Sequence, residues 1–296
     1  MRQFLGLAVL AWMAAGGAAA QDAGGTPPPP PVPAPQAAMV APEWRTVSSE
    51  NLLVIDTTKG RILVELTPEV APLHVERIKL LARRGFYDGV PWHRVIDWFM
   101  AQTGDPLGNG EGQSPYPDLK GEFTFRREAT LPFAAVAEPA GARVGFLHSL
   151  PIQTQPDSAF AMTADGKVHA WGLYCPGVAG MARDEGNDTA NSQFFLMRQA
   201  YPALDKRYSI WGMTVSGLDV VRNLKVGDGD NGMVGAESDR MTRVRIAAGI
   251  PEAERPSVQV LATDSPRFRA LVETTRAARG ADFSVCDVTL PVQVVN

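Results

Sequence analysis

The feature that most constrains the fold is a long series of short apolar segments, separated by Gly, Pro, Asn and Asp, with only two helical stretches among them. These segments are rich in β-branched and aromatic residues and are too short for typical helices, so we expect strands. They are Leu52–Thr57, Arg61–Leu66, Trp92–Ile96, Phe99–Thr103, Arg143–Leu147, Ser158–Met162, Gly177–Ala182, Gln193–Met197, Tyr208–Met213 and Thr242–Ala247. Because short strands leave exposed edges unless the sheet closes, the pattern predicts a mainly β protein with a closed antiparallel barrel.

The two helical stretches lie within this series. Pro68–Arg84 has apolar residues at helical spacing, with Thr67 as the expected N-cap and Gly85 as the residue that ends the helix. A second helix is expected over Ser216–Leu224. No internal repeat is visible, and we therefore expect one barrel domain, over residues 44–250.

Composition agrees with a loop-rich globular chain. The 296 residues include 28 glycines and 24 prolines, which favour turns, and 45% are hydrophobic, which excludes a chain that is disordered throughout. The formal net charge of −4 gives no basic surface for nucleic acid or an anionic membrane.

The first twenty residues have the pattern of a cleavable signal peptide. Arg2 is followed by the apolar stretch Phe4–Ala15, which is too short to span a bilayer, and Ala18–Ala20 precedes Gln21 as an A-x-A cleavage site. The alternative is a buried N-terminal helix. The pattern predicts an exported protein, periplasmic or secreted, with no membrane anchor.

Residues 21–43 are rich in proline and carry few charged or large apolar side chains. Such a segment cannot bury a core and favours extended polyproline II conformation. We expect a disordered spacer between the signal peptide and the folded part. A ligand for a proline-binding partner is the alternative.

Two segments carry the side chains of a candidate site. In Phe86–Asp105 (FYDGVPWHRVIDWFMAQTGD), alternation along strands can place Arg94 and Gln102 on one face, while Phe99 and Met100 break the alternation as at a bend. In Gly177–Met197, a polar loop is flanked by the further candidates Ala182, Arg183, Gln193 and Phe195. Together they supply an apolar slot, a guanidinium and amide groups. No acid–base pair accompanies them, so nucleophilic or proton-transfer chemistry is poorly supported.

Metal binding is also poorly supported by the sequence. His148, His169 and Cys175 have spacings that match no standard site. The segment GDGDNG (Gly227–Gly232) has some calcium-loop character, but the glycine and glutamate that such a loop requires are not at their positions, so we expect a surface turn.

At these segments the chain resembles the cyclophilin family of peptidyl-prolyl cis–trans isomerases. The resemblance runs from about Leu52 to Ala248. The motifs, in order, are APLHVERIKLLARRGFYDGVPWHRVI, FMAQTGD, GVAGMAR, NSQFFLM and LDKRYSIWGMTVSGLDVV. The resemblance implies a closed eight-stranded antiparallel barrel capped by two α-helices, with a substrate groove on its outer face.

The resemblance also implies roles for individual residues. Arg94 matches the catalytic arginine, and His93 matches the groove-lining residue before it. The pocket for the proline ring would be formed by Phe99, Met100, Phe195 and Leu204, with Tyr208 where many members carry a histidine. The peptide backbone would be held by Gln102, Ala182, Arg183 and Gln193.

The implied activity is isomerisation of X–Pro bonds in unfolded or exported polypeptides, by a monomer that needs no cofactor or metal. One alternative is a peptide-binding or chaperone protein of the same fold with little catalysis. Another is an extracytoplasmic scaffold whose Pro-rich segment and tail carry the function.

The chain departs from the family pattern at several places. Ala203 stands where many eukaryotic members carry Trp, Asp97 replaces Pro, and Thr103 replaces Gly. Asp184 follows Arg183 where a small or neutral residue is usual, and we expect that it can pair with Arg183. These changes affect rate and peptide preference more than the reaction itself.

Two segments lie outside the family pattern. An insertion is expected over about residues 132–171, bordering the groove. Residues 251–296 form a C-terminal extension, with a helix over Pro266–Arg279 and a strand over Phe283–Val295, expected to pack on the barrel. In an oxidising compartment Cys175 and Cys286 could pair and tie this tail to the barrel, although the sequence does not decide whether they meet.

Overall fold

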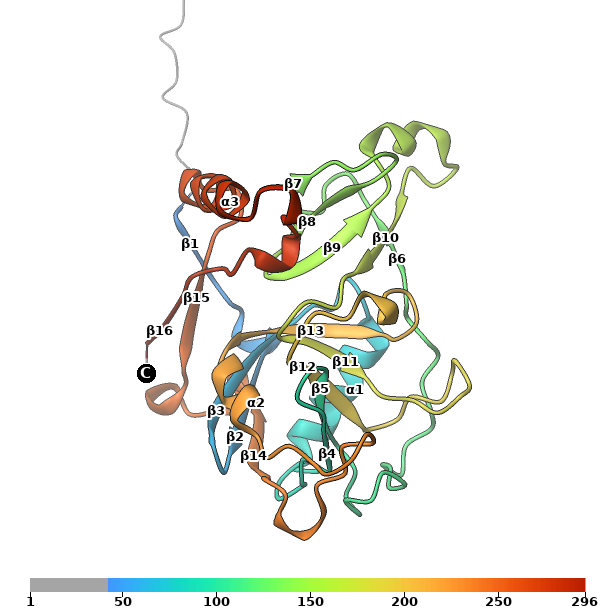
Figure 1. Ribbon diagram of the computed structural model, residues 1–296, viewed down its shortest axis with the longest axis vertical. Coiled ribbons are helices and arrows are strands. Elements are labelled where there is room, and N and C mark those ends of the chain that lie inside the picture. The colour runs from blue at the N-terminus through green and yellow to red at the C-terminus, as the bar shows by residue number, and fades with distance from the viewer. Residues whose placement is uncertain (1–41, 296) are drawn as a thin grey trace, which may run out of the picture. The chain divides into compact units, whose positions relative to one another are not determined.

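The computed structural model describes residues 42–295, which lie within one compact unit and contain three antiparallel sheets and three α-helices (Figure 1). The predicted signal peptide and nearly all of the predicted spacer lie outside the described residues. Within residues 42–295, no helix combines the length and apolar character needed to cross a bilayer.

The largest sheet has eight antiparallel strands in the order β14-β2-β3-β13-β11-β12-β5-β4. The strands are β2 (Leu52–Thr57), β3 (Gly60–Leu66), β4 (Arg94–Val95), β5 (Met100–Thr103), β11 (Val178–Met181), β12 (Phe194–Met197), β13 (Ile210–Ser216) and β14 (Met241–Ile246). Each overlaps a segment that the sequence predicts as a strand. The sheet curls around a core that α1 (Pro72–Arg83) and α2 (Leu218–Asn223) complete, through side chains such as Val75, Ile78 and Val221.

The predicted closure of this sheet into a barrel is wrong. β14 and β4 are its two edges, and in the described part of the chain no strand ladder pairs them. The segments beside them are joined by isolated bridges, at Pro91–Arg240 and Arg94–Met233, and by single hydrogen bonds such as that from the N–H of Trp92 to the carbonyl of Asp239. β4 has two residues, and a proline offers no N–H to a ladder, so a continuous row of hydrogen bonds cannot form there. The sheet is therefore an open, curled half-barrel.

Helix α1 begins later than the sequence pattern predicts. Thr67 is not its N-cap, because its N–H donates to the carbonyl of Trp211 at 3.0 Å and so continues the sheet. Ala71 has φ −144° and ψ 73°, and Pro72 follows it as the first helical residue. A residue before proline is pushed out of the helical region, so the helix starts at this proline and not at Pro68. The predicted end is confirmed, since Gly85 has φ +66°.

A second sheet of five strands, in the order β6-β10-β9-β8-β7, lies above the first in Figure 1. Its strands are β6 (Phe125–Arg127), β7 (Phe133–Ala137), β8 (Arg143–Leu147), β9 (Leu150–Thr154) and β10 (Val168–Gly172). The predicted strand Ser158–Met162 is wrong, because Asp157–Met162 is a 3₁₀ helix that follows Pro156. Of these five strands, only β8 was predicted from the sequence pattern.

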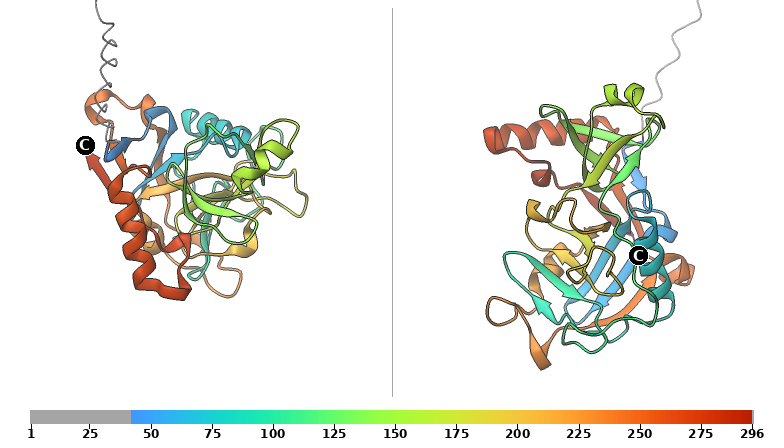
Figure 2. Two further views of the ribbon diagram at one scale, coloured as in Figure 1. Left: turned by 90° about the horizontal axis from the view of Figure 1, so that it is seen from above. Right: turned by 90° about the vertical axis from the view of Figure 1, so that its right-hand side faces the viewer.

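The third sheet joins the start of the described chain to its end. It consists of β1 (Trp44–Thr46), β15 (Ser257–Leu261) and β16 (Val292–Val295) in the order β1-β15-β16 (Figure 2). Helix α3 (Pro266–Arg279) has the predicted bounds and begins at Ser265, whose side chain accepts from the N–H of Phe268. The predicted strand over residues 283–295 is confirmed only at its end, as β16.

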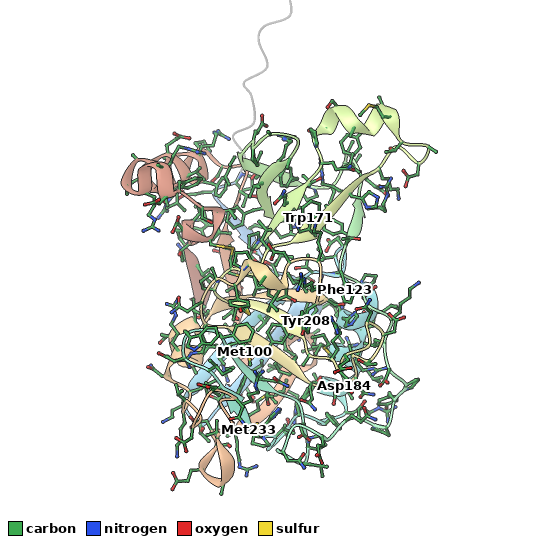
Figure 3. All side chains as sticks on the ribbon, turned by 45° about the vertical axis from the view of Figure 1, so that its right-hand side comes forward. Met100, Phe123, Trp171, Asp184, Tyr208 and Met233 are labelled. Atoms are coloured by element: carbon green, nitrogen blue, oxygen red, sulfur yellow. A yellow bond between two sulfur atoms is a disulfide. The ribbon has the colours of Figure 1, made fainter. Side chains whose placement is uncertain are left out.

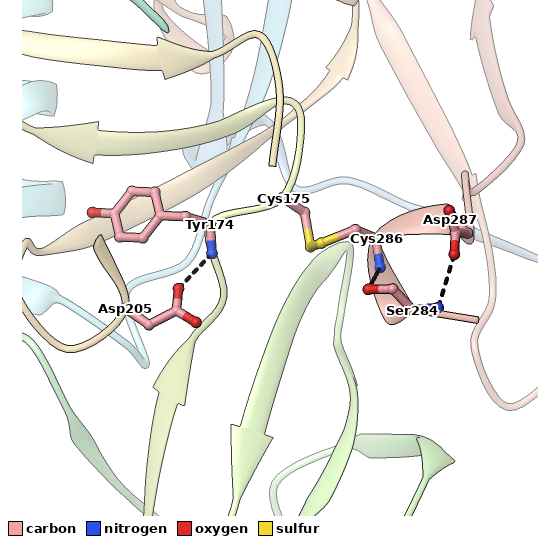
Figure 4. The surroundings of a disulfide bond; sticks show 6 residues. All are labelled: Tyr174, Cys175, Asp205, Ser284, Cys286 and Asp287. Atoms are coloured by element: carbon pink, nitrogen blue, oxygen red, sulfur yellow. Dashed lines mark hydrogen bonds between the residues drawn. A yellow bond between two sulfur atoms is a disulfide. The ribbon is translucent and has the colours of Figure 1, made fainter. Parts of the chain in front are cut away.

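Several 3₁₀ turns connect these elements. Besides Asp157–Met162 they are Ser49–Asn51, Pro202–Leu204, Gly235–Glu237, Ala247–Gly249, Glu252–Glu254, Gly280–Asp282 and Val285–Asp287. The last turn has a capping box, formed by the side chains of Ser284 and Asp287 (Figure 4). It carries Cys286, which is joined to Cys175 by a disulfide with a Cα–Cα distance of 5.1 Å. The tail is thus linked covalently to the segment that leads into β11.

Candidate active site

The predicted site residues meet on one face of the eight-stranded sheet. Arg94 on β4 lies opposite Gln102 on β5, and Gln102 lies opposite Phe195 on β12. Residues directly opposite each other in antiparallel strands project to the same face. The strand pairing therefore places a guanidinium, an amide and an aromatic ring in one row.

The guanidinium of Arg94 is held by two hydrogen bonds. Its Nη1 donates to Oε1 of Gln102 at 3.1 Å, and its Nε donates to the carbonyl oxygen of Asn231 at 2.8 Å. Burial lowers the pKa of Arg94, and Tyr208 opposes this change, but an arginine stays charged at neutral pH. Among residues 42–295, Nη2 has no hydrogen-bond partner, so it can donate to a ligand.

Two glutamines extend this network into a polar wall. Nε2 of Gln102 donates to Oε1 of Gln193 at 2.9 Å. Nε2 of Gln193 then donates to the carbonyl oxygens of Gly110 and Gly112, at 2.8 and 2.9 Å. A cavity of about 350 Å³ opens beside the two glutamines. Its lining also includes Ala182, Arg183, Asp184, Thr189 and Asn191.

The apolar part of the site is built around the ring of Phe195. Tyr208 meets this ring edge-on at 6.0 Å, and Tyr174 stacks on it at 5.8 Å. Gly180 makes room for the side chains of Phe195 and Tyr174, because a Cβ at this position would lie 2.6 Å from Cζ of Phe195 and 2.7 Å from Oη of Tyr174. Met100 and Leu204 belong to the same cluster and are 1% and 9% exposed. Figure 3 shows Met100 and Tyr208 on the same side of the molecule.

The predicted binding residue His93 lies beneath the surface of the site. His93 is 1% exposed, as Met100 is, so its ring is almost fully covered by neighbouring residues. Burial lowers the pKa of His93, although Asp105 and Gln193 oppose the shift, and the ring is neutral at pH 7. Because Gln193 acts on this ring, His93 lies behind the polar wall that Gln102 and Gln193 form.

The guanidinium of Arg183 makes its hydrogen bonds within the protein. Its guanidinium donates to the carbonyl oxygens of Arg207, Asp184 and Glu185 and lies 4.5 Å from the ring centroid of Tyr208. The expected pairing with the Asp184 carboxylate is not formed, because the backbone carbonyl of Asp184 takes its place. Arg183 therefore shapes the wall beside Tyr208, while Ala182 lies nearby and donates its N–H to the carbonyl of Gln193 at 2.9 Å.

Several residues that contribute to the site were not predicted from the sequence. Asn231 holds Arg94 through its backbone carbonyl, from the segment GDGDNG that was expected to be only a surface turn. Tyr174 supports Phe195, but it lies outside the motifs that carry the resemblance. A carbonyl contact gives no signal in side-chain chemistry, whereas Tyr174 could have been noticed as an aromatic residue shortly before GVAGMAR.

The described residues contain no group of three or more His, Cys, Asp or Glu side chains arranged to hold a metal ion. What the site does offer is a charged donor beside an apolar pocket, next to a polar cavity. This arrangement can hold an apolar ring and donate a hydrogen bond to an atom at its edge.

Comparisons with known proteins agree on one family. Residues 52–248 match the family model described as "Cyclophilin type peptidyl-prolyl cis-trans isomerase/CLD". A Brucella suis protein named "Probable peptidyl-prolyl cis-trans isomerase" is 34% identical over 211 residues, covering 67% of this chain and 84% of that protein. A Schizosaccharomyces pombe protein named "Peptidyl-prolyl cis-trans isomerase ppi1" is 33% identical over 171 residues, covering 57% of this chain and 82% of that protein.

A solved structure is similar over a larger share of the chain. The crystal structure of cyclophilin AquaCyp293 from Hirschia baltica superposes with a TM-score of 0.77 and 33% identity, covering 85% of this chain and 93% of that chain. This share exceeds the range of the family model, so the likeness extends beyond residues 52–248.

Proposed function

The chain belongs to the family of cyclophilin-type peptidyl-prolyl cis–trans isomerases, and we propose that it catalyses rotation about X–Pro bonds in exported polypeptides, with Arg94 as the catalytic residue. The observation that carries the proposal is the row formed by Arg94, Gln102 and Phe195. It puts a fixed cationic donor at the edge of an apolar pocket.

The reaction needs only a change in the bonding at the proline nitrogen. Resonance across the peptide C–N bond gives a rotation barrier of about 18–20 kcal/mol. X–Pro bonds populate both isomers but exchange over tens to hundreds of seconds. A donor that binds the nitrogen lone pair better in the twisted state than in either planar state lowers this barrier.

Arg94 suits this role because two of its nitrogens are already held by the protein and Nη2 remains free. In the proposed complex, the proline ring occupies the pocket at Phe195, Met100, Phe99 and Leu204. The guanidinium then donates to the proline nitrogen as it becomes pyramidal. Gln102 keeps the guanidinium in place, so little reorganisation is needed at the moment of rotation.

The test is a proline-limited peptide isomerisation assay on the wild type and Arg94→Ala. Arg94→Ala removes a hydrogen bond that forms mainly in the transition state, and this loss is expected to lower kcat/KM by about 100-fold. Arg243→Ala is the matched control, because Arg243 is exposed on β14 and takes no part in the hydrogen bonds that join Arg94, Gln102 and Asn231. Unchanged activity in Arg94→Ala would remove Arg94 from the mechanism.

The same assay distinguishes catalysis from peptide binding alone. If wild type and Arg94→Ala both leave the isomerisation at its uncatalysed rate while proline peptides still bind, the protein is a peptide-binding or chaperone protein instead. Export is the other part of the proposal and rests on residues 1–20. The expected mature chain, recovered from the periplasm or medium, begins at Gln21, and a mature chain retaining Met1 would contradict export by cleavage.

A further inference from the structure

The turn between β4 and β5 displays a tryptophan in solvent next to the proposed proline pocket. Trp98 is 62% exposed, although its neighbour Phe99 packs against the apolar cluster that contains Met100 and Phe195. Among residues 42–295 it is the one aromatic side chain among the exposed large apolar residues. A large aromatic side chain that is exposed beside a binding site is available for contact with a bound ligand.

Trp98 is one of three aromatic rings that lie together. Its ring stacks on Phe99, with centroids 5.7 Å apart and planes at 23°. Tyr201 lies 4.7 Å from Phe99 and 6.0 Å from Trp98. We call Trp98, Phe99 and Tyr201 the aromatic platform. It continues the apolar pocket outward, since Phe99 belongs to both.

The platform is held rigidly even though it is exposed. Asp97, which replaces the usual proline of the family, makes an ion pair with Arg198 at 2.5 Å. Arg198 is 3% exposed and also donates to the carbonyl oxygens of Val221 and Arg222. Its own N–H donates to the carbonyl of Phe99 at 2.9 Å. The backbone of the turn is thus fixed on both sides of Trp98, and the ring itself stacks on Phe99.

The other edge of the platform is fixed as well. The N–H of Tyr201 donates to the carbonyl of Tyr174 at 2.9 Å, and Tyr174 stacks on Phe195 in the pocket. Pocket and platform therefore share one support. An ordered aromatic surface of this kind loses little conformational entropy when it binds a ligand.

We propose that the aromatic platform binds a large apolar or aromatic side chain that flanks the isomerised proline, so that the enzyme prefers such clients. The inference rests on the proposed isomerase function. Residues in an extended peptide follow one another at about 3.3 Å, so a residue beside the proline reaches a ring that borders the proline pocket. Trp98 and Tyr201 are then specificity-determining residues, and Asp97 is a positioning residue.

The experiment compares short peptides that carry Phe or Ala immediately before or immediately after a single proline. For each peptide, kcat/KM is measured by NMR exchange with the wild type, Trp98→Ala, Trp98→Phe and the control Met162→Ala. Met162 is 79% exposed and lies in the second sheet's 3₁₀ turn, far along the chain from the platform. Wild type is expected to favour Phe over Ala at one of the two positions by about fivefold to tenfold.

The pattern across variants decides the inference. Trp98→Ala is expected to bring the ratio of kcat/KM for Phe and Ala peptides near one, mainly through a change in KM. Trp98→Phe and Met162→Ala are expected to leave this ratio unchanged. A wild type that accelerates Phe and Ala peptides equally at both positions, or a ratio that survives Trp98→Ala, overturns the platform proposal while the isomerase function stands. A wild type that accelerates no peptide overturns the proposed function itself.

Discussion

Asp105 illustrates how one buried carboxylate can shape a binding surface that it does not touch. Its Oδ1 accepts from the N–H of Leu107 at 2.7 Å, and its Oδ2 accepts from Asn109 and Gly110 at 2.9 and 2.6 Å. The loop folded around Asp105 presents the carbonyl of Gly110 to Gln193. Burial alone would raise the pKa of Asp105, but the backbone hydrogen bonds outweigh it, and the pKa lies below its ordinary value of 3.8.

Asp105→Asn is therefore expected to reduce the free energy of unfolding at pH 7 by about 1–3 kcal/mol, because the amide nitrogen faces backbone donors. Since the folded pKa of the carboxyl is depressed, its contribution is complete above pH 3.8 and is lost as the pH falls through the folded value. Urea unfolding measured from pH 7 down through the folded pKa should show that the difference in the free energy of unfolding between wild type and variant becomes smaller at low pH. Asp282→Asn, at an exposed position, is the control, and an equal loss there would contradict the assignment.

At the scale of single residues, the sequence predicted the side chains of the site better than the backbone groups that hold them in place. The pairing of Arg94 with Gln102 follows from strand alternation, so it could be expected before the structure was known. Thr103, noted as a departure from the family pattern, donates to the carbonyl of Pro91 at 2.8 Å. Backbone partners such as this one and the carbonyl of Asn231 depend on how distant loops close, which no local pattern reveals.

Among the elements, helix α1 has its first turn capped from outside the helix. Ala71 offers no side-chain cap. Instead, the carboxylate of Glu122 accepts from the N–H groups of Leu73 and His74 at 3.2 and 3.1 Å, and it also contacts Nδ1 of His74 at 2.7 Å. The sequence predicted the helix from its period but misplaced its start, because this cap comes from a residue 48 positions away from His74.

Glu122→Ala is expected to lower the free energy of unfolding by about 1–2 kcal/mol, since two N–H groups at the helix start lose their acceptor. Chemical unfolding followed by circular dichroism measures this change. Glu76→Ala provides the comparison within the same helix, because Glu76 is 69% exposed and, among residues 42–295, is paired only with Lys79. That variant should change stability by less than about 0.5 kcal/mol, and equal effects would argue against the capping role.

In the whole folded unit, the parts outside the family core are integrated with it. Val258 and Val260 of β15 pack against Leu52, Val54 and Leu63 on the outer face of the eight-stranded sheet. Deleting residues 251–296 would uncover these side chains, so truncation does not isolate the catalytic half-barrel. The sequence predicted a packed tail and left the cysteine pairing open. Most of the second sheet was missed because segments such as FAAVA (Phe133–Ala137) lack strong alternation and gain their strand form from their neighbours.

Removing the disulfide tests whether the tail affects the pocket as well as the stability of the fold. It joins Cys175 and Cys286 across a sequence separation of 111, beside a cavity of about 330 Å³ between the half-barrel and the tail. Replacing both cysteines by serine is expected to lower the free energy of unfolding by about 2–4 kcal/mol, chiefly because the unfolded chain becomes less constrained. The pocket should change little, since Tyr174 remains held through Asp205, which accepts its N–H at 2.9 Å (Figure 4).

The measurements are urea unfolding and kcat/KM on the same double variant. Because Tyr174 has anchors besides its neighbour Cys175, stability is expected to fall while kcat/KM stays within about twofold of wild type. Wild-type protein treated with a reductant supplies a second route to the same state without a change of side chain. If kcat/KM instead falls tenfold while the folded fraction is unchanged, the tail controls the pocket through the disulfide, and the site cannot be regarded as a property of the half-barrel alone.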